Sequence, residues 1–315
     1  MSNMIDYAAC AKLLKAGDNY LIVSHLRPDG DTLGSSGALC HALRRLGKTA
    51  YMFNNIEITE KYAAYVSEFA APESFRAQKI ISVDIADTGL FALGFEGDVD
   101  LCIDHHPSNS RYAEKLLLGE KKSACGEIVL ELIMELCGNI DETEAQLLYI
   151  AISTDTGCFQ YSNTNAATFR AAAQTVEAGA DVHEINQRFF RKTSKARILL
   201  ESMIYDGMTF HKNDAVVIAT VTLSMMEKAG ATENDCDDLA SLSGRPETAL
   251  VSVTIRELEG GKSKISVRSG PEVNSSDICA VYGGGGHAMA AGCSMDCGVA
   301  QAKEKILAAI ETVMR

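Results

Sequence analysis

Short apolar runs alternate with longer amphipathic stretches along the first 185 residues of the chain. The apolar runs at residues 20–24, 49–53, 79–83 and 99–103 predict buried strands. The amphipathic stretches predict helices, at residues 33–46, 59–69, 125–137, 142–153 and 166–178. Strands and helices that alternate at this spacing are typical of a parallel sheet with helices on both faces. The pattern therefore predicts an α/β fold for this part of the chain.

The pattern changes after about residue 208. Strands are predicted at residues 215–222, 248–256 and 264–268, short helices at 223–229 and 236–242, and a final amphipathic helix at 300–314. A basic stretch at residues 187–197 precedes this region, and we interpret it as part of a connecting helix with a solvated face; the alternative is a basic wall of an inter-domain cleft. We therefore predict a first α/β domain at 1–186, a connecting segment at 187–207 and a smaller α/β domain at 208–315.

Histidines and aspartates follow three of the predicted strands. They are His25, Asp29 and Asp31 after the first strand, Asp84 after the third, and Asp104, His105 and His106 after the fourth. Because the carboxyl ends of parallel strands meet at one sheet edge, we expect these side chains to lie together. Imidazole with several carboxylates suits manganese, magnesium or iron better than structural zinc. The alternatives are local: a surface turn at Asp29-Gly-Asp31 and a cap or turn at Asp84.

Asp155 lies in Thr154-Asp-Thr-Gly157, directly after an otherwise apolar helix. It is either a turn residue or one more carboxylate of the same cluster. Ser35 lies where the helix after Asp31 begins, and the start of a helix favours phosphate. Ser35 is therefore a candidate substrate-binding residue.

The second predicted domain carries four consecutive glycines, residues 283–286, followed by His287. Such a run lets backbone N–H groups approach an anion closely, and its flanks are apolar and small, which disfavours a flexible linker. Arg268 ends a predicted strand, and a guanidinium binds phosphate bidentately; the alternative is a surface arginine. The candidate substrate-binding residues here are Arg268, Gly284, Gly285, Gly286 and His287.

The chain is acidic. Its 315 residues include 29 Lys and Arg against 42 Asp and Glu, a formal net charge of −13. This balance argues against a protein that coats long nucleic acid, but it is compatible with a small phosphorylated substrate. No signal peptide or membrane-length apolar run is evident, and the ten cysteines are scattered, so we expect a cytoplasmic protein with free thiols. Cys293 and Cys297 are interpreted as buried thiols rather than a zinc site.

Taken together, these motifs resemble the DHH phosphoesterase superfamily with its DHH-associated C-terminal domain. The residues that carry the resemblance are Ser24-His-Leu-Arg-Pro-Asp-Gly-Asp31, Val83-Asp84, Asp104-His-His106, Thr154-Asp-Thr-Gly157, and Gly283 to His287. The resemblance spans nearly the whole chain in the expected order. Size and domain plan are most similar to the NrnA-type oligoribonuclease and pAp phosphatase group. RecJ exonucleases usually carry extra domains, and family II pyrophosphatases lack the glycine-rich ending.

The resemblance implies two Mn²⁺ ions, with Mg²⁺ or another divalent ion as alternatives. One ion would be held by His25, Asp29 and Asp84, and the other by Asp31, Asp84, His105 and Asp155. Asp104 would orient a ligand, and His106 would face the substrate phosphate, so that the catalytic residues are Asp84, Asp104 and His106. Arg268, the glycine run and His287 would bind the substrate from the other side of an inter-domain cleft.

The activity implied is hydrolysis of short oligonucleotides, such as nanoRNA and pApA-type dinucleotides, to nucleoside monophosphates, and of pAp to AMP. Water activated by the two metals would attack phosphorus. The alternatives are a cyclic dinucleotide phosphodiesterase and a non-catalytic nucleotide sensor. The expected partner is the nucleotide substrate, with no long duplex DNA and no membrane, and both a monomer and a homodimer are compatible with the sequence.

Overall fold

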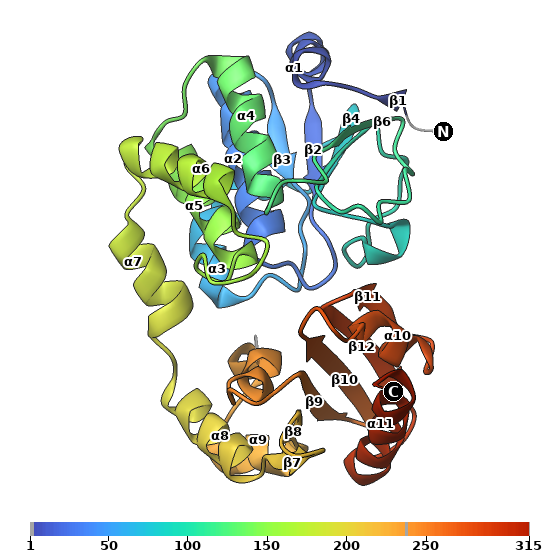
Figure 1. The fold of residues 1–315 in the computed structure, drawn as a ribbon. Coiled ribbons are helices and arrows are strands. Elements are labelled where there is room, and N and C mark those ends of the chain that lie inside the picture. Colours follow the sequence, from blue (N-terminus) through green and yellow to red (C-terminus); the bar gives the residue numbers. More distant parts are fainter. Residues whose placement is uncertain (1–2, 237–238, 315) are drawn as a thin grey trace. The chain divides into compact units, whose positions relative to one another are not determined.

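The computed structural model describes residues 3–236 and 239–314, and the chain divides into two compact units at residues 1–192 and 193–315 (Figure 1). The first unit is built on a parallel sheet with the strand order β1-β6-β5-β4-β2-β3. Its strands are β1 (Asn3–Met4), β2 (Tyr20–Val23), β3 (Ala50–Met52), β4 (Lys79–Val83), β5 (Leu101–Asp104) and β6 (Lys115–Leu118). The predicted α/β class and parallel sheet are confirmed.

Helices of the first unit cover one face of this sheet. They are α1 (Tyr7–Ala16), α2 (Gly30–Arg45), α3 (Glu60–Val66), α4 (Cys125–Cys137), α5 (Glu142–Asp155), α6 (Ala166–Glu177) and α7 (Val182–Asn186). Their buried side chains form one core with alternate strand residues such as Ile81, Leu101 and Ile103. Figure 1 shows α2, α4, α5 and α6 gathered on the same side of the strands.

The opposite face needs a correction to the prediction of helices on both sides. In the described part of the chain its apolar cluster comes from strands and loops, with Val99, Cys102, Ala113 and Leu116 at its centre. The β4–β5 connection carries only the 3₁₀ helix η2 (Thr88–Leu90), and the β5–β6 connection carries no helix. For the β5–β6 connection the physical reason is length, because a helical crossover usually takes a dozen or more residues and residues 105–114 fall short of that. The β4–β5 connection, residues 84–100, is long enough for a helix but folds as a loop around η2.

Two helices that position the later site begin at well-formed caps. Asp29 is the N-cap of α2, and its side chain accepts hydrogen bonds from the backbone N–H groups of Asp31 and Thr32. Asp141 forms a capping box with Glu144 at the start of α5. The helix predicted at 142–153 extends two residues further, so that Asp155 is the last residue of α5.

The second unit contains a mixed sheet with the order β11-β12-β10-β9-β8-β7, in which only β8 and β9 pair in parallel. Its strands are β7 (Thr209–His211), β8 (Val216–Val221), β9 (Val251–Leu258), β10 (Lys262–Ser269), β11 (Gly285–His287) and β12 (Ala290–Met295). Its helices are α8 (Lys195–Asp206), α9 (Leu223–Ala229), α10 (Ser275–Ala280) and α11 (Val299–Val313), and η3 (Gln187–Arg191) lies before it in the chain.

One prediction for this unit differs from the structure. The helix expected at 236–242 is replaced by the 3₁₀ segments η4 (Glu233–Cys236) and η5 (Leu239–Gly244), with residues 237–238 outside the described part of the chain. The pattern did not predict a conformation for the glycine run, and in the structure Gly285 and Gly286 pair with β12 and form strand β11 together with His287. None of the described helices of either unit is both long and apolar enough to cross a membrane.

Candidate metal centre

Seven side chains from five segments of the first unit meet at the carboxyl edge of its parallel sheet. His25 follows β2, Asp84 follows β4, and Asp104 ends β5 directly before His105. Asp29 and Asp31 lie at the start of α2, and Asp155 is contributed by the end of α5. The structure thus brings together the residues that the sequence predicted as metal ligands, and they could hold a cation.

The first group consists of His25, Asp29 and Asp84. The His25 Nε2 atom lies 3.5 Å from Asp29 Oδ1 and 3.9 Å from Asp84 Oδ2. His25 Nδ1 lies 2.8 Å from the carbonyl oxygen of Leu26, so the Nδ1–H donates there and the Nε2 lone pair faces the carboxylates. This is the tautomer that a metal-binding histidine needs.

The second group consists of Asp31, His105 and Asp155, with Asp84 shared between the two groups. His105 Nε2 lies 3.5 Å from Asp84 Oδ1, 3.8 Å from Asp155 Oδ2 and 3.9 Å from Asp31 Oδ2. His105 Nδ1 donates to the carbonyl oxygen of Lys122 at 3.1 Å, which fixes the ring in the same way as in His25. One oxygen of Asp84 therefore faces each group.

Backbone geometry places Asp84 between the two groups. Its φ is +63°, in the left-handed region that residues with a side chain seldom adopt. The Asp84 N–H still donates to the carbonyl oxygen of Ile103 at 2.9 Å, so the turn out of β4 is held by the neighbouring strand. Such a conformation at a carboxylate is typical of a functional site.

The Asp31 carboxylate is held by the start of α4. Oδ2 accepts from the Cys125 N–H at 2.6 Å and Oδ1 accepts from the Gly126 N–H at 2.9 Å. The positive end of the helix macrodipole favours the charged form of this carboxylate. Ser35 also donates to Oδ1, at 3.1 Å, and is fully buried. That burial leaves no surface of Ser35 for a substrate phosphate, so the prediction of substrate binding is replaced by a role in orienting Asp31.

The cluster is electrostatically unbalanced without a cation. Burial, reinforced by Asp155, raises the pKa of Asp31 to about 7, and burial also raises the pKa of Asp155 to about 7. The pKa of Asp84, which is 5% exposed, is raised well above its usual value by burial and then by Asp31. The Oδ1 atom of Asp84 is buried without a hydrogen-bond partner. A divalent cation would offset the repulsion between the carboxylates and would give Asp84 Oδ1 a binding partner. The residues present therefore fit a divalent cation.

His106 lies beside these groups, with its Nδ1 3.6 Å from Asp84 Oδ1, and belongs to a hydrogen-bond chain of its own. Its Nδ1–H donates to Asp104 Oδ1 at 2.8 Å, and Asp104 Oδ2 accepts from Asn109 Nδ2 at 2.6 Å. Asp104 is fully buried, and although burial opposes ionisation, His106 and Asn109 hold its pKa below the usual value. The ring of His106 is thereby fixed at the edge of the site.

The sequence analysis did not single out Asn109 and Asn55, whose side-chain amides donate hydrogen bonds to residues of this site. Asn55 Nδ2 donates to Ser24 Oγ at 3.1 Å and to the carbonyl oxygen of His25 at 2.9 Å. For Asn109 the one available signal was its position five residues after Asp104. From sequence alone, an asparagine in a loop is interpreted as a turn residue.

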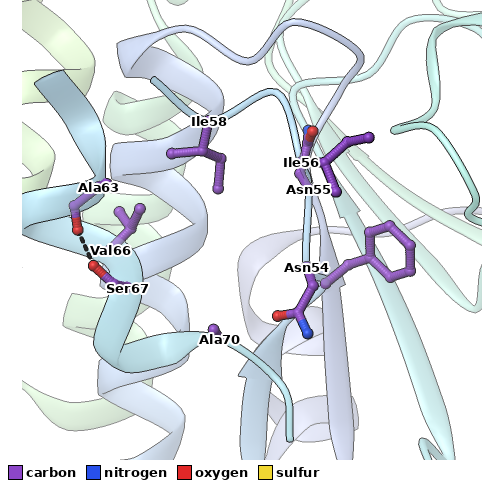
Figure 2. Close-up of a pocket in the computed structure, with 9 residues that line it drawn as sticks. Asn54, Asn55, Ile56, Ile58, Ala63, Val66, Ser67 and Ala70 are labelled. Atoms are coloured by element: carbon purple, nitrogen blue, oxygen red, sulfur yellow. Dashed lines mark hydrogen bonds between the residues drawn. The ribbon is translucent and has the colours of Figure 1, made fainter. Parts of the chain in front are cut away.

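Asn55 also lines a hollow of about 220 Å³ beneath the β3–α3 connection. Figure 2 shows its lining, which is mostly apolar, with Ile58 and Val66 on one side and Asn54 and Asn55 on the other. Ser67 donates to the carbonyl oxygen of Ala63 within the helical wall. None of the predicted ligands lines this hollow, so it is separate from the candidate metal centre.

A further cluster of His41, Asp141 and Glu144 has a different character. The Arg45 guanidinium lies within it, with Nη1 2.6 Å from Glu144 Oε2 and Nε 3.6 Å from Asp141 Oδ2. The arginine already supplies the positive charge, so we interpret this cluster as a structural link between α2 and α5.

In the second unit, the predicted phosphate-binding residues lie in one cross-strand row. Arg268 pairs with Ala290, and Ala290 pairs with His287. Directly paired residues of antiparallel strands project from the same face, and both Arg268 and His287 are exposed. Gly286, with a φ of +145°, lies beside His287, and a Cβ atom on it would lie 2.6 Å from the carbonyl oxygen of Ala290.

Comparison with known proteins identifies the family. The N-terminal domain profile of the DHH family matches residues 19–152, and the DHHA1 domain profile matches residues 213–315. The bifunctional oligoribonuclease and PAP phosphatase NrnA of Thermus thermophilus is 32% identical over 306 residues, covering 95% of this chain and 92% of that protein. The chain belongs to the DHH family. The resemblance predicted from the motifs is thus confirmed, and this DHH protein is a hydrolase of phosphoester bonds.

Two further similarities agree with that assignment. The bifunctional oligoribonuclease and PAP phosphatase NrnA of Mycoplasma genitalium is 27% identical over 295 residues, covering 89% of each chain. The crystal structure of an exopolyphosphatase-related protein from Bacteroides fragilis matches with a TM-score of 0.87 at 21% identity, over 97% of this chain and 95% of that chain. At that identity the structural match supports the fold of this DHH protein.

Proposed function

We propose that this DHH protein hydrolyses short oligoribonucleotides to nucleoside monophosphates and converts pAp to AMP, with two Mn²⁺ ions in the first unit. The observation that carries the proposal is Asp84, which stands between two histidine–carboxylate groups and has a buried oxygen without a hydrogen-bond partner. The NrnA relatives, named as oligoribonucleases and PAP phosphatases, support the choice of substrates.

The proposed ligands follow the two groups. His25, Asp29 and Asp84 hold one ion, and Asp31, Asp84, His105 and Asp155 hold the other. When bound, such ions polarise phosphoryl oxygens and make water a stronger nucleophile. The chain's own contribution is orientation: backbone carbonyl oxygens hold both histidines by Nδ1, and the start of α4 holds Asp31.

His106 is the proposed proton donor to the leaving oxygen. Because Asp104 engages its Nδ1–H, Nε2 is the ring nitrogen that we assign to the substrate phosphate. Although burial alone would lower the pKa of His106, its hydrogen bond to Asp104 raises the pKa above the usual value, which favours the protonated form. Asn109 completes the support by fixing Asp104.

The second unit is proposed to bind the substrate. Arg268 and His287 project from one face of its sheet, on either side of Ala290, and the adjacent Gly284, Gly285 and Gly286 expose backbone to an anion. Guanidinium and imidazole side chains at this spacing suit a phosphate group that is not the one being hydrolysed.

The test is product release from a panel of substrates, measured by chromatography after the purified protein has been stripped of metal and supplied with Mn²⁺, Mg²⁺ or Zn²⁺. The panel contains pAp, pApA, a five-nucleotide RNA, a long single strand, a cyclic dinucleotide and pyrophosphate. We expect rapid release of monophosphates from pApA and the short RNA, and of AMP from pAp, with Mn²⁺ most effective and little action on the long strand.

A matched pair of variants controls the assignment to the cluster. Asp84→Ala should abolish turnover on every substrate, whereas Asp98→Ala, which removes an exposed carboxylate outside the cluster, should leave it unchanged. Turnover of the cyclic dinucleotide or pyrophosphate alone would replace the proposed substrates. Bound metal without any turnover would support a nucleotide sensor instead.

A further inference from the structure

The segment that leads into α4, residues 122–126, contacts two of the proposed ligands. The carbonyl oxygen of Lys122 accepts a hydrogen bond from His105 Nδ1 at 3.1 Å. The first two N–H groups of α4 donate to the two carboxylate oxygens of Asp31, at 2.6 Å and 2.9 Å. His105 and Asp31 both belong to the second group of the candidate metal centre. The position of this segment therefore determines where both ligands lie.

Helix α4 begins without a cap of its own. Its N-cap residue is Ala124, whose side chain has no polar atom. The N–H groups at the start of a helix have no partners within the helix, so they need acceptors from elsewhere. Asp31 is such an acceptor, although it lies 94 residues before Cys125 in the sequence. Asp31 thus keeps its position only if the first turn of α4 keeps its own.

A buried polar network fixes this first turn. Glu127, which is 2% exposed, accepts on Oε1 from the Ser123 N–H at 3.2 Å and from the Thr168 hydroxyl at 2.9 Å. Ser123 Oγ lies 2.6 Å from Thr168 Oγ1 and donates to the carbonyl oxygen of Asn163 at 2.6 Å. A buried carboxylate is costly unless donors of this kind surround it. The network therefore links the start of α4 to the start of α6.

The same network reaches a third proposed ligand. Asn163 Nδ2 donates to the carbonyl oxygen of Ser123 at 3.0 Å and to that of Asp155 at 3.1 Å. Asp155, like Asp31 and His105, belongs to the second group. Three of the four proposed ligands of one ion are thus connected to a single set of buried hydrogen bonds.

The first group is held by other parts of the chain. Leu26 and Asn55 hold His25, and the Asp29 carboxylate accepts from N–H groups at the start of α2. A change in the network should therefore act on one group and leave the other intact.

We propose that Ser123 and Thr168 are positioning residues that set the affinity of the ion held by the second group, here called the second ion. This inference rests on the proposed function, because it needs a cation at Asp31, His105 and Asp155. Residues that orient metal ligands through hydrogen bonds typically change metal affinity by about 10- to 100-fold. The alternative is a purely structural role, since Thr168 also forms a capping box with Asn165 at the start of α6.

The test is a titration of the metal-stripped chain with Mn²⁺, in which the free ion is measured by its electron paramagnetic resonance signal. The wild type should bind two ions. Thr168→Val removes the hydroxyl at nearly constant volume and should raise the Kd of one ion by about 10- to 100-fold, with the other unchanged. Thr168→Ser keeps the hydroxyl and should bind both ions as the wild type does.

Thr175→Val is the matched control. Thr175 lies on the same helix and is as fully buried as Thr168, but its hydroxyl donates to the carbonyl oxygen of Ala172 at 2.7 Å, within α6. A purely structural role predicts that both valine variants lower Tm and that neither changes a Kd for Mn²⁺. The proposal predicts a changed Kd in Thr168→Val alone.

Two double variants show which ion is weakened. Asp31→Asn removes a ligand of the second group only, and Asp29→Asn removes a ligand of the first group only while keeping a residue that caps α2. Thr168→Val should leave the Kd of the ion that remains in Asp31→Asn unchanged. It should raise the Kd of the ion that remains in Asp29→Asn by the same factor as in the wild type. The reverse pattern would overturn the proposal.

Asn163→Ala extends the test to an exposed position, where the substitution spares the core. It removes the hydrogen bond to the Asp155 carbonyl oxygen and should also raise the Kd of the second ion. Unchanged Mn²⁺ binding in Thr168→Val and Asn163→Ala, alongside normal pApA hydrolysis by the wild type, would refute the network alone. Selective loss of the second ion in these variants, with no hydrolysis by the wild type, would refute the proposed function alone. A wild type that binds one Mn²⁺ would overturn both.

Discussion

The buried carboxylates predict that the metal-free protein becomes less stable as the pH rises. Asp31 is 1% exposed, and burial together with Asp155 raises its pKa to about 7. In an unfolded chain an aspartate ionises near pH ~3.9. Between these values the folded chain keeps a proton that the unfolded chain has lost. The stabilising contribution is therefore fully present below pH ~4 and is lost as the pH rises through about 7.

The magnitude follows from the linkage between proton binding and folding. Each such carboxyl removes up to about 1.4 kcal/mol of unfolding free energy per pH unit in this interval. Asp31 alone thus accounts for up to about 3 kcal/mol between pH ~5 and ~7, or on the order of 5–10 °C in Tm for a unit of this size. Asp155 acts in the same direction but contributes less, because its side chain is 30% exposed.

His25 and His106 also make the metal-free protein less stable as the pH rises. Burial alone would lower the pKa of His25 and of His106, but Asp29 and Asp104 raise both above the usual value, and the stabilisation from these charged pairs is lost as the pH rises. The pKa of Asp104 is lowered despite its burial, so its contribution disappears only as the pH falls below the unfolded value. It does not oppose the effect between pH ~5 and ~8.

The assay is thermal unfolding followed by circular dichroism in excess chelator, at constant ionic strength, from pH 5 to pH 8. We expect Tm to fall steadily across the range, and Asp31→Asn to flatten the slope. Added Mn²⁺ should raise Tm, and by more at pH 8 than at pH 5, because ionised carboxylates bind a cation more strongly. A metal-free Tm that is constant or rises with pH would refute the electrostatic argument.

Three further predictions concern the proposed site. Asp84→Ala should abolish turnover and lower the bound metal measured by mass spectrometry; near-normal turnover with full metal content would contradict the shared ligand. Asn109→Ala should lower kcat and cost about 1–3 kcal/mol of unfolding free energy in denaturant titration, since it leaves a buried oxygen of Asp104 without its donor. Arg268→Ala should mainly raise KM in steady-state kinetics, and an effect confined to kcat would mean that its contact forms only in the transition state.

Much of the candidate site was predictable because its proposed ligands follow apolar runs. His25, Asp84 and His105 each follow a strand that is recognisable from composition, and parallel pairing then brings them to one edge. Asp155 was harder to predict from pattern alone, because it ends a helix and not a strand. Only packing of α5 against α2 brings its carboxylate to the same place.

What the pattern could not predict depends on interactions distant in sequence. Strand β11 consists of Gly285, Gly286 and His287, which carry no apolar signal, and it forms because β12 offers an unpaired edge. The pattern also did not predict that loops, and not helices, cover the second face of the first sheet, and the reason is related. Its cluster combines aromatic residues such as Phe91 and Tyr112 that are scattered through loops without any period. The burial of Ser35 likewise appears only once α4 and α5 pack on α2.

The proposed ligands are drawn from five segments between residues 25 and 155, and this spread has a consequence for the protein's lifetime. An unfolded chain cannot hold such distant side chains together, so a cation selects the folded state and stabilises it by mass action. Free cation at about 100 times its Kd would add about 2.7 kcal/mol. We therefore expect a cell short of the cation to lose the protein itself to proteolysis, as well as its activity.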